Sequence, residues 1–259
     1  MQYREILCTS LVRKITRPDT LFHGMYSIDP YQNCEFGCSY CDSSQENVIY
    51  IKQNADAMLQ EELEELKQGP IIIGSVHDPY QPCEQKYEIT KKILQIIKKN
   101  DFPCHILTKS PLIIRDKQLL TSMDSQITVS LLSLQEKVSS IFEKNITSTI
   151  ARLKLIKQLN QNKIKAGVAL IPILPYITDK EIEKIIRKAK KYSARYFLYK
   201  QLELKGEQKE DFFEELQKHY PTLIQKYHEL YKSTILPSIY YSQELNKNIR
   251  DMCKKYDFL

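Results

Sequence analysis

Three cysteines of the chain stand within eight residues of one another, as Cys34, Cys38 and Cys41. Their C-x3-C-x2-C spacing directs three thiolates toward one centre, and soft sulfur ligands favour zinc or an iron–sulfur cluster. A structural zinc site takes four protein ligands, but the next cysteine along the chain is Cys83. A cubane cluster held by three cysteines would leave one iron open to an external ligand. The motif therefore predicts a metal centre, either zinc or a reactive cluster.

Polar residues at the ends of predicted strands form a second group of candidates. Asp78 follows the second predicted strand, where it can orient a ligand or cap the turn before Pro79. Lys109 ends the third strand, and it is either an exposed loop lysine or a cation that needs an anionic partner. Ser130 closes the fourth strand and can bind a ligand or face a helix. Each of these residues keeps an ordinary structural interpretation beside the functional one.

The elements that must position these residues follow from hydrophobic periodicity. From residue 25 onward, short runs rich in Ile, Val, Leu or Tyr alternate with longer amphipathic stretches. In one stretch Ile89, Ile93 and Ile97 recur at helical spacing, which is typical of a helix that packs on a sheet. Strands are predicted at 25–28, 71–75, 104–108, 127–132, 165–171 and 195–199. Helices are predicted near 56–68, 84–100, 112–122, 147–161 and 179–193.

Six repeated β/α units favour a parallel sheet that curls into a full or partial barrel, because parallel strands need crossover helices. The sequence thus predicts an α/β protein, a partial (β/α)6 TIM-like barrel with a C-terminal helical extension; an open doubly wound sheet is the alternative. In both folds chemistry sits at the carboxyl ends of the strands. The predicted parts are an N-terminal extension (1–24), the β/α core (25–200) and a helical cap of the same domain (201–259).

Composition excludes several classes of protein. With 259 residues, 42% of them hydrophobic, the chain can bury a large core and is not a disordered protein. The excess of 38 Lys+Arg over 32 Asp+Glu gives a net charge of +6, which solvated helix faces explain and which permits an anionic partner. The longest apolar stretch, 167–177, is shorter than the about 18 to 20 residues of a membrane span. Without a recognisable signal peptide, we expect a cytoplasmic protein with no membrane association.

The cysteine motif resembles that of the radical SAM superfamily, in which C-x3-C-x-aromatic-C follows the first strand of a β/α array. Two further segments, Asp78-Pro79-Tyr80-Gln81-Pro82 and Thr108-Lys109-Ser110, make the chain similar to a narrower group. That group is the DNA repair photolyase-like proteins related to spore photoproduct lyase. The resemblance runs from about residue 20 to the end of the chain.

This resemblance implies a [4Fe-4S] cluster on the three motif cysteines, with S-adenosylmethionine on the fourth iron. An electron from a reducing partner such as flavodoxin or ferredoxin would cleave S-adenosylmethionine and start hydrogen abstraction from a substrate. The resemblance implies a DNA lesion or a nucleotide as that substrate, and a lyase as the class of enzyme. It also implies contacts with S-adenosylmethionine: Tyr40 against the adenine, Lys109 on the carboxylate, Ser130 on the amino-acid moiety, and Asp78 on the ribose or the substrate.

Three function classes stay open on the sequence. The first is a radical SAM enzyme for DNA or nucleotides, and the second is a radical SAM enzyme for a peptide, RNA or metabolite, because one fold serves many chemistries. The third is a zinc-stabilised nucleic-acid-binding protein. The resemblance to spore photoproduct lyase is incomplete at one position, because Ser75 stands where those lyases carry a hydrogen-donating cysteine. A hydroxyl holds its hydrogen more tightly than a thiol, so we do not expect efficient spore photoproduct repair.

Overall fold

The computed structural model describes residues 1–44 and 46–258, apart from the side chain of Ser44. The chain divides into two compact units. Unit 1 comprises Met1–Glu35, Glu46–Val129 and Gln158–Ala166, and unit 2 comprises Phe36–Gln45, Ser130–Lys157 and Gly167–Leu259. The boundary between the units falls inside the cysteine motif. The predicted divisions after residues 24 and 200 remain predictions.

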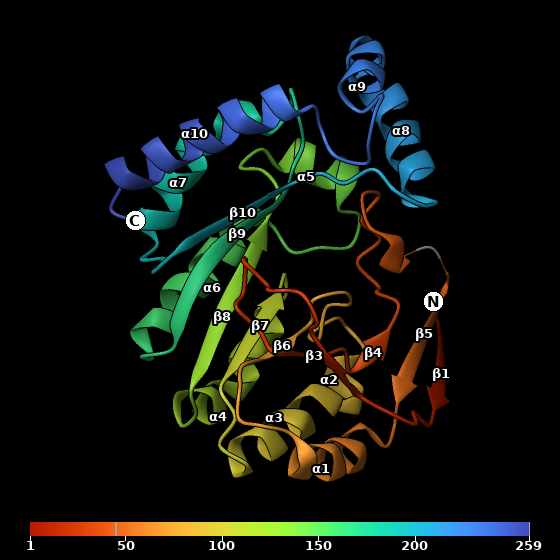
Figure 1. Cartoon of the computed structure of the whole chain (residues 1–259), viewed down its shortest axis with the longest axis vertical. Helices are drawn as coiled ribbons and strands as arrows, with labels where there is room; N and C mark the ends of the chain where they lie inside the picture. Colours follow the sequence, from red (N-terminus) through yellow and green to blue (C-terminus); the bar gives the residue numbers. More distant parts are fainter. Residues whose placement is uncertain (45, 259) are drawn as a thin grey trace. The chain divides into compact units, whose positions relative to one another are not determined.

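Unit 1 is built on neighbouring strands of a mostly parallel sheet, which Figure 1 shows side by side. The strands β3 (Tyr26–Ile28), β6 (Ile71–Ile73), β7 (Cys104–Thr108) and β8 (Ser125–Leu131) pair in parallel in that order, and β2 (Val12–Lys14) is antiparallel to β3. β8 runs on by two residues into unit 2. Nearly every residue of β6 to β8 is buried, as the interior of a parallel sheet requires.

Short helices accompany these strands in unit 1. α1 (Ala55–Glu65) packs beside α3 (Ile89–Lys99), and α3 packs beside α4 (Lys117–Thr121). The sequence predicts one helix over 84–100, but the structure divides it into α2 (Glu84–Tyr87) and α3. Glu88 adopts a left-handed conformation between them, with φ 51°. The buried Glu84 carboxylate compensates for this break because it accepts the N–H groups of the first turn of α3.

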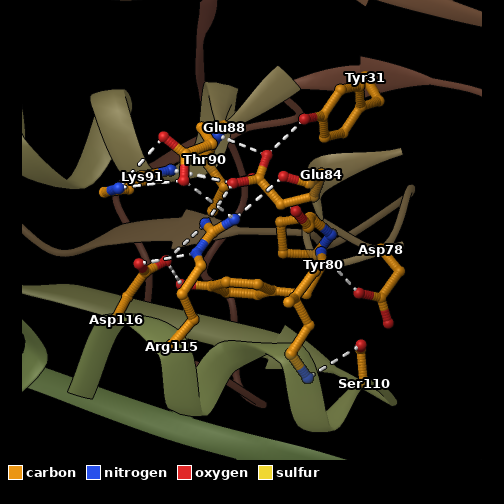
Figure 2. Close-up of polar contacts among 12 residues, drawn as sticks. Tyr31, Asp78, Tyr80, Glu84, Glu88, Thr90, Lys91, Ser110, Arg115 and Asp116 are labelled. Atoms are coloured by element: carbon orange, nitrogen blue, oxygen red, sulfur yellow. Dashed lines mark hydrogen bonds and ion pairs between the residues drawn. The ribbon is translucent and has the colours of Figure 1, made fainter. Parts of the chain in front are cut away.

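A buried ionic network surrounds Glu84 (Figure 2). The Arg115 guanidinium donates to Glu84 Oε1 at 2.6 Å and to Asp116 Oδ2 at 2.8 Å. The Tyr80 hydroxyl donates to Asp116 Oδ2 at 3.0 Å, and the Tyr31 hydroxyl donates to Glu84. Burying two carboxylates is costly unless they are paired and hydrogen-bonded, and Arg115 provides the charge for both. The network therefore fixes the chain at Tyr80 and at the start of α2.

A small second sheet in unit 1 was not predicted from the sequence. β1 (Gln2–Ile6) pairs in parallel with β5 (Val48–Lys52), and β4 (Tyr31–Gln32) is antiparallel to β5. The N-terminal residues thus contribute two strands, β1 and β2, to unit 1. The cysteine motif follows β4, so a short strand intervenes between β3 and the motif.

Unit 2 combines two parallel strands with most of the C-terminal helices. β9 (Lys165–Ile173) starts at the end of unit 1 and pairs with β10 (Phe197–Gln201). The helix α6 (Thr149–Gln161) belongs to unit 2 up to Lys157 and to unit 1 from Gln158 onward. Helix pairs that pack together are α7 with α10, α5 with α8, and α8 with α9. These helices are α5 (Glu136–Phe142), α7 (Ile182–Lys191), α8 (Gln208–His219), α9 (Ile224–Leu230) and α10 (Ile239–Lys255).

The region 201–259, which the sequence predicts to be a helical extension, contains α8 and α9, and these two helices flank Pro221. α10, beyond Pro237, lies in the same region. Among the described helices, none combines the length and apolarity needed to cross a bilayer.

His105 on β7 is a buried histidine of the core. Its Nε2 lies 2.5 Å from Thr128 Oγ1, and burial lowers the pKa of His105 to about 4. Between pH 6.5 and 4 the unfolded chain therefore binds a proton that the folded chain does not, and stability falls as pH falls through this window. Between pH 7 and 4 the unfolding free energy of the unsubstituted chain should therefore fall by about 3 kcal/mol more than that of the His105→Gln variant.

Urea unfolding at a series of pH values measures this effect. An identical profile for His105→Gln and the unsubstituted chain would contradict the assignment.

Candidate metal and cofactor site

The first motif cysteine belongs to unit 1, where hydrogen bonds hold the chain on both sides of it. Cys34 is buried. Asn33 before it adopts a left-handed conformation, φ 67°, and its side-chain amide donates to Val48 O at 2.9 Å. Gln81 accepts the Glu35 N–H at 2.9 Å and donates to Asn33 O at 3.1 Å. The backbone that carries Cys34 is therefore fixed before any metal binds.

The other two motif cysteines belong to unit 2. Gly37, between the first and second cysteines, has φ 63°, a conformation that glycine adopts without strain. Cys38 is buried and forms an isolated antiparallel bridge with Glu143. Cys41 is partly exposed, and its N–H donates to Cys38 O at 3.1 Å in a tight turn. This part of the motif is thus a compact loop tied to the chain that follows α5.

Tyr40 is anchored by a buried ion pair that sequence reasoning missed. Its hydroxyl donates to Glu143 Oε1 at 2.5 Å, and Arg152 Nη2 lies 2.8 Å from Glu143 Oε2. The side chains of Arg152 and Glu143 are 1% and 0% exposed. Burial, together with the nearby Cys38 and Glu143, raises the pKa of Tyr40 well above its ordinary value. The phenol therefore stays protonated and keeps donating to Glu143.

One signal in the sequence could have identified Arg152. It lies four residues before Ile156 and seven before Leu159, so it falls on the apolar stripe of α6. A charge on such a stripe must have a buried partner, because an unpaired buried cation is costly. No comparable local signal indicates that Glu143 is that partner.

Asp78 and Lys109, both predicted site residues, lie together in unit 1. Asp78 Oδ1 accepts the Thr108 hydroxyl at 2.7 Å and the Tyr80 N–H at 2.9 Å, and Oδ2 accepts the Lys109 N–H at 2.7 Å. Burial raises the pKa of Asp78, and these hydrogen bonds oppose that shift. Asp78 thus caps its own turn and fixes the backbone of Lys109 at the carboxyl end of β7, while both side chains remain partly exposed.

Ser130 lies at the end of β8 in unit 2 and is almost completely buried. Its hydroxyl donates to Ile171 O at 3.4 Å, and its carbonyl accepts Arg152 Nη1 at 3.0 Å. Ser130 is therefore linked through Arg152 to the ion pair that anchors Tyr40.

The donor set of the motif fits an iron–sulfur cluster in its chemistry, since it consists of three thiols. Among the described residues, no three His, Cys, Asp or Glu side chains are already grouped as metal ligands. At the next cysteine, Cys83, burial and then the neighbouring Glu35 raise the pKa of the thiol far above its ordinary value.

Comparison with known proteins decides the family. A family model described as the Radical SAM superfamily matches residues 28–189, which is more than half of the chain. The chain belongs to the radical SAM superfamily. Membership implies S-adenosylmethionine and an iron–sulfur cluster as cofactors, and it supports the two enzyme classes among the three predicted from the sequence.

Two relatives of this radical SAM protein cover most of its length. An uncharacterised protein of Mycobacterium tuberculosis is 25% identical over 98% of this chain and 81% of the relative. An uncharacterised protein of Methanocaldococcus jannaschii is 28% identical over 81% of this chain and 82% of the relative.

Solved structures show the same fold. Spore photoproduct lyase aligns with a TM-score of 0.75 and 13% identity, over 98% of this chain and 79% of the lyase. A form of that lyase with bound AdoMet and dinucleoside spore photoproduct gives the same values. SuiB of Streptococcus suis, bound to precursor peptide SuiA, aligns with a TM-score of 0.58 and 14% identity, over 89% of this chain and 46% of SuiB. The predicted α/β fold of the partial TIM-barrel type is confirmed for this radical SAM protein.

Proposed function

We propose that this protein holds a [4Fe-4S] cluster on Cys34, Cys38 and Cys41, cleaves S-adenosylmethionine reductively and abstracts hydrogen from a nucleotide or a DNA lesion. The observation that carries the proposal is the three-thiol motif, which lies within the segment that matches the family. When bound, the cluster and S-adenosylmethionine supply the electron transfer and the radical that starts the reaction. A reducing protein such as flavodoxin or ferredoxin is the proposed source of electrons.

The residues of this chain bind and orient the cofactor in the proposed site. Lys109 presents an ammonium group to the carboxylate of S-adenosylmethionine, and Asp78 keeps the Lys109 backbone in place. Tyr40 has its hydroxyl engaged with Glu143, so the ring is what it offers to the adenine. Ser130 contributes a hydroxyl near the amino-acid moiety. The protein's part is therefore orientation and exclusion of water, while the cofactors carry the difficult chemistry.

Replacing Lys109 tests this arrangement. We expect Lys109→Ala to leave the cluster intact and to weaken S-adenosylmethionine binding by about 1.5 to 3 kcal/mol, the value of one charge-assisted hydrogen bond. Calorimetric titration of the reconstituted protein measures the affinity. Lys117→Ala, in the exposed first turn of α4, is the control. Equal affinities for the two variants would make Lys109 an ordinary loop lysine.

A nucleotide or DNA lesion is the proposed substrate class for two reasons. The Asp78–Pro82 and Thr108–Ser110 segments resemble those of the photolyase-like group, and the fold of spore photoproduct lyase extends over 98% of this chain. The spore photoproduct itself is not the proposed substrate. Ser75, after β6, is exposed and stands in place of the hydrogen-donating cysteine, and its O–H bond is too strong for that role.

Anaerobic reconstitution followed by product analysis tests the proposed function. We expect about four irons per chain with acid-labile sulfide, and 5′-deoxyadenosine after reduction with S-adenosylmethionine. Damaged DNA should increase 5′-deoxyadenosine formation, whereas spore-photoproduct dinucleotide should not be repaired over multiple turnovers. Zinc in place of iron would reject the proposed chemistry. Stimulation by peptides but not by DNA or nucleotides would instead favour a peptide substrate, as in the complex of SuiB with its precursor peptide SuiA.

A further inference from the structure

Gln81 has no role in the proposed reaction, yet its side chain is completely buried beside a motif cysteine. Its Oε1 accepts the Glu35 N–H at 2.9 Å, and its Nε2 donates to Asn33 O at 3.1 Å. One side-chain amide thus satisfies a donor and an acceptor that flank a single residue, Cys34. Because the planar amide bonds to both neighbours of Cys34, it restricts rotation of the backbone between them and so restrains the conformation of Cys34.

A second set of bonds joins the same two segments. The Glu35 carboxylate accepts the Cys83 N–H at 2.6 Å and the Tyr3 hydroxyl at 2.8 Å. Hydrogen bonds therefore join segment 33–35 to segment 81–83 at two points, Gln81 and Cys83. Since Gln81, Glu35 and Cys83 are buried, an unmade bond among them would leave a desolvated polar atom.

The segment that carries Gln81 is itself anchored at both ends. At its start, Asp78 accepts the Thr108 hydroxyl and the Lys109 N–H. Further along, the Tyr80 hydroxyl donates to Asp116, and Glu84 pairs with Arg115 (Figure 2). Residues 78–84 therefore connect the carboxyl end of β7, which bears Lys109, to the loop that bears Cys34. All of these contacts lie within unit 1.

We infer that Gln81 is a positioning residue that holds the Cys34 backbone ready for cluster binding and sets its place relative to Lys109. The inference rests on the proposed function for its consequence, since Cys34 is taken to bind the cluster. Its structural part, the restraint on Cys34, is independent of that function and can be measured in the metal-free protein.

Three variants separate the role of the amide from simple packing. Gln81→Met keeps the length of the side chain but removes both hydrogen bonds. Gln81→Glu retains an acceptor for the Glu35 N–H and replaces the donor to Asn33 O with a carboxylate. Gln208→Met is the matched control, because Gln208 is also buried and its amide donates to Glu203 O at 2.8 Å, in unit 2.

The first measurement is the rate at which iodoacetamide alkylates each cysteine of the metal-free protein, read by mass spectrometry. A buried thiol reacts only when its surroundings open. We expect Gln81→Met and Gln81→Glu to speed alkylation of Cys34 by about tenfold or more, as the loss of buried hydrogen bonds implies. Cys253, buried in α10, is the internal reference and should keep its rate. A variant that unfolds globally would accelerate Cys253 as well, so a specific effect is recognisable.

The second measurement is cluster content and the electron paramagnetic resonance signal of the reduced protein, with and without S-adenosylmethionine. We expect both Gln81 variants to bind less iron and to show an altered signal and a weaker response to S-adenosylmethionine, whereas Gln208→Met behaves like the unsubstituted protein. The inference would be overturned if the Gln81 variants had the same alkylation rates and electron paramagnetic resonance signals as Gln208→Met. Equal acceleration of Cys34 and Cys253 alkylation in both Gln81 variants would overturn it as well. If the unsubstituted protein binds no cluster, the proposed function fails, and the alkylation rates still decide whether Gln81 restrains Cys34.

Discussion

Single replacement of Cys34, Cys38 or Cys41 by Ala is expected to abolish both the reconstituted cluster and the cleavage of S-adenosylmethionine. In the proposed site each of these thiolates would hold a different iron of the cubane, and we expect two thiolates to be too few to retain a cluster that already has one open iron. Iron and sulfide analysis, the visible absorption of the cluster and 5′-deoxyadenosine formation measure the loss.

Cysteines outside the motif provide the controls. Cys8 and Cys253, near the two ends of the described chain, should tolerate replacement by Ala with cluster content unchanged. A full cluster in the Cys38→Ala protein would contradict the assignment of the motif as the cluster site.

Loss of the Arg152 charge is expected to have the largest effect on stability. Arg152→Met would leave the Glu143 carboxylate buried without its ionic partner, and breaking a buried pair in this way costs about 3 to 5 kcal/mol. The difference in unfolding free energy is measured by urea titration of the metal-free protein. Lys218→Met is the control, because it removes an exposed pair with Glu214 and should cause no measurable change.

A double variant distinguishes a lost ion pair from a packing defect. Replacing Glu143 by Leu together with Arg152→Met removes both charges, so it should cost less than the sum of the two single replacements. Purely additive losses would mean that packing, and not the ion pair, makes these residues important.

Local sequence patterns were sufficient for the parallel strands. The structure gives β7 the bounds that the sequence predicts, because its run of apolar residues lies between Pro103 and the polar turn after Thr108. The small sheet could not be found in this way. The first four residues of β1 are exposed and lack apolar alternation, and the partner of Gln2 is Val48. A strand of that kind forms only where the folded chain offers it the edge of another strand, here β5, that is distant in the sequence.

The helix boundary at Glu88 illustrates the same limit. The apolar spacing of 84–100 favours one helix, and no proline or glycine interrupts it. The division of α2 from α3 depends on Glu84, whose carboxylate caps α3 while it is paired with Arg115. A tertiary ion pair therefore overrides the local preference for a continuous helix.

By itself, the sequence determined the three-thiol motif, the β/α alternation and membership of the radical SAM superfamily, because these depend on residue type and on spacing along the chain. Only the tertiary structure decided which groups hold the motif. Tyr40 and Glu143 are 103 residues apart, and Gln81 lies 46 residues from Glu35. Periodicity relates residues within a few helical turns or strand repeats, whereas a buried polar group bonds to whatever partner the folded backbone brings within 3 Å or so.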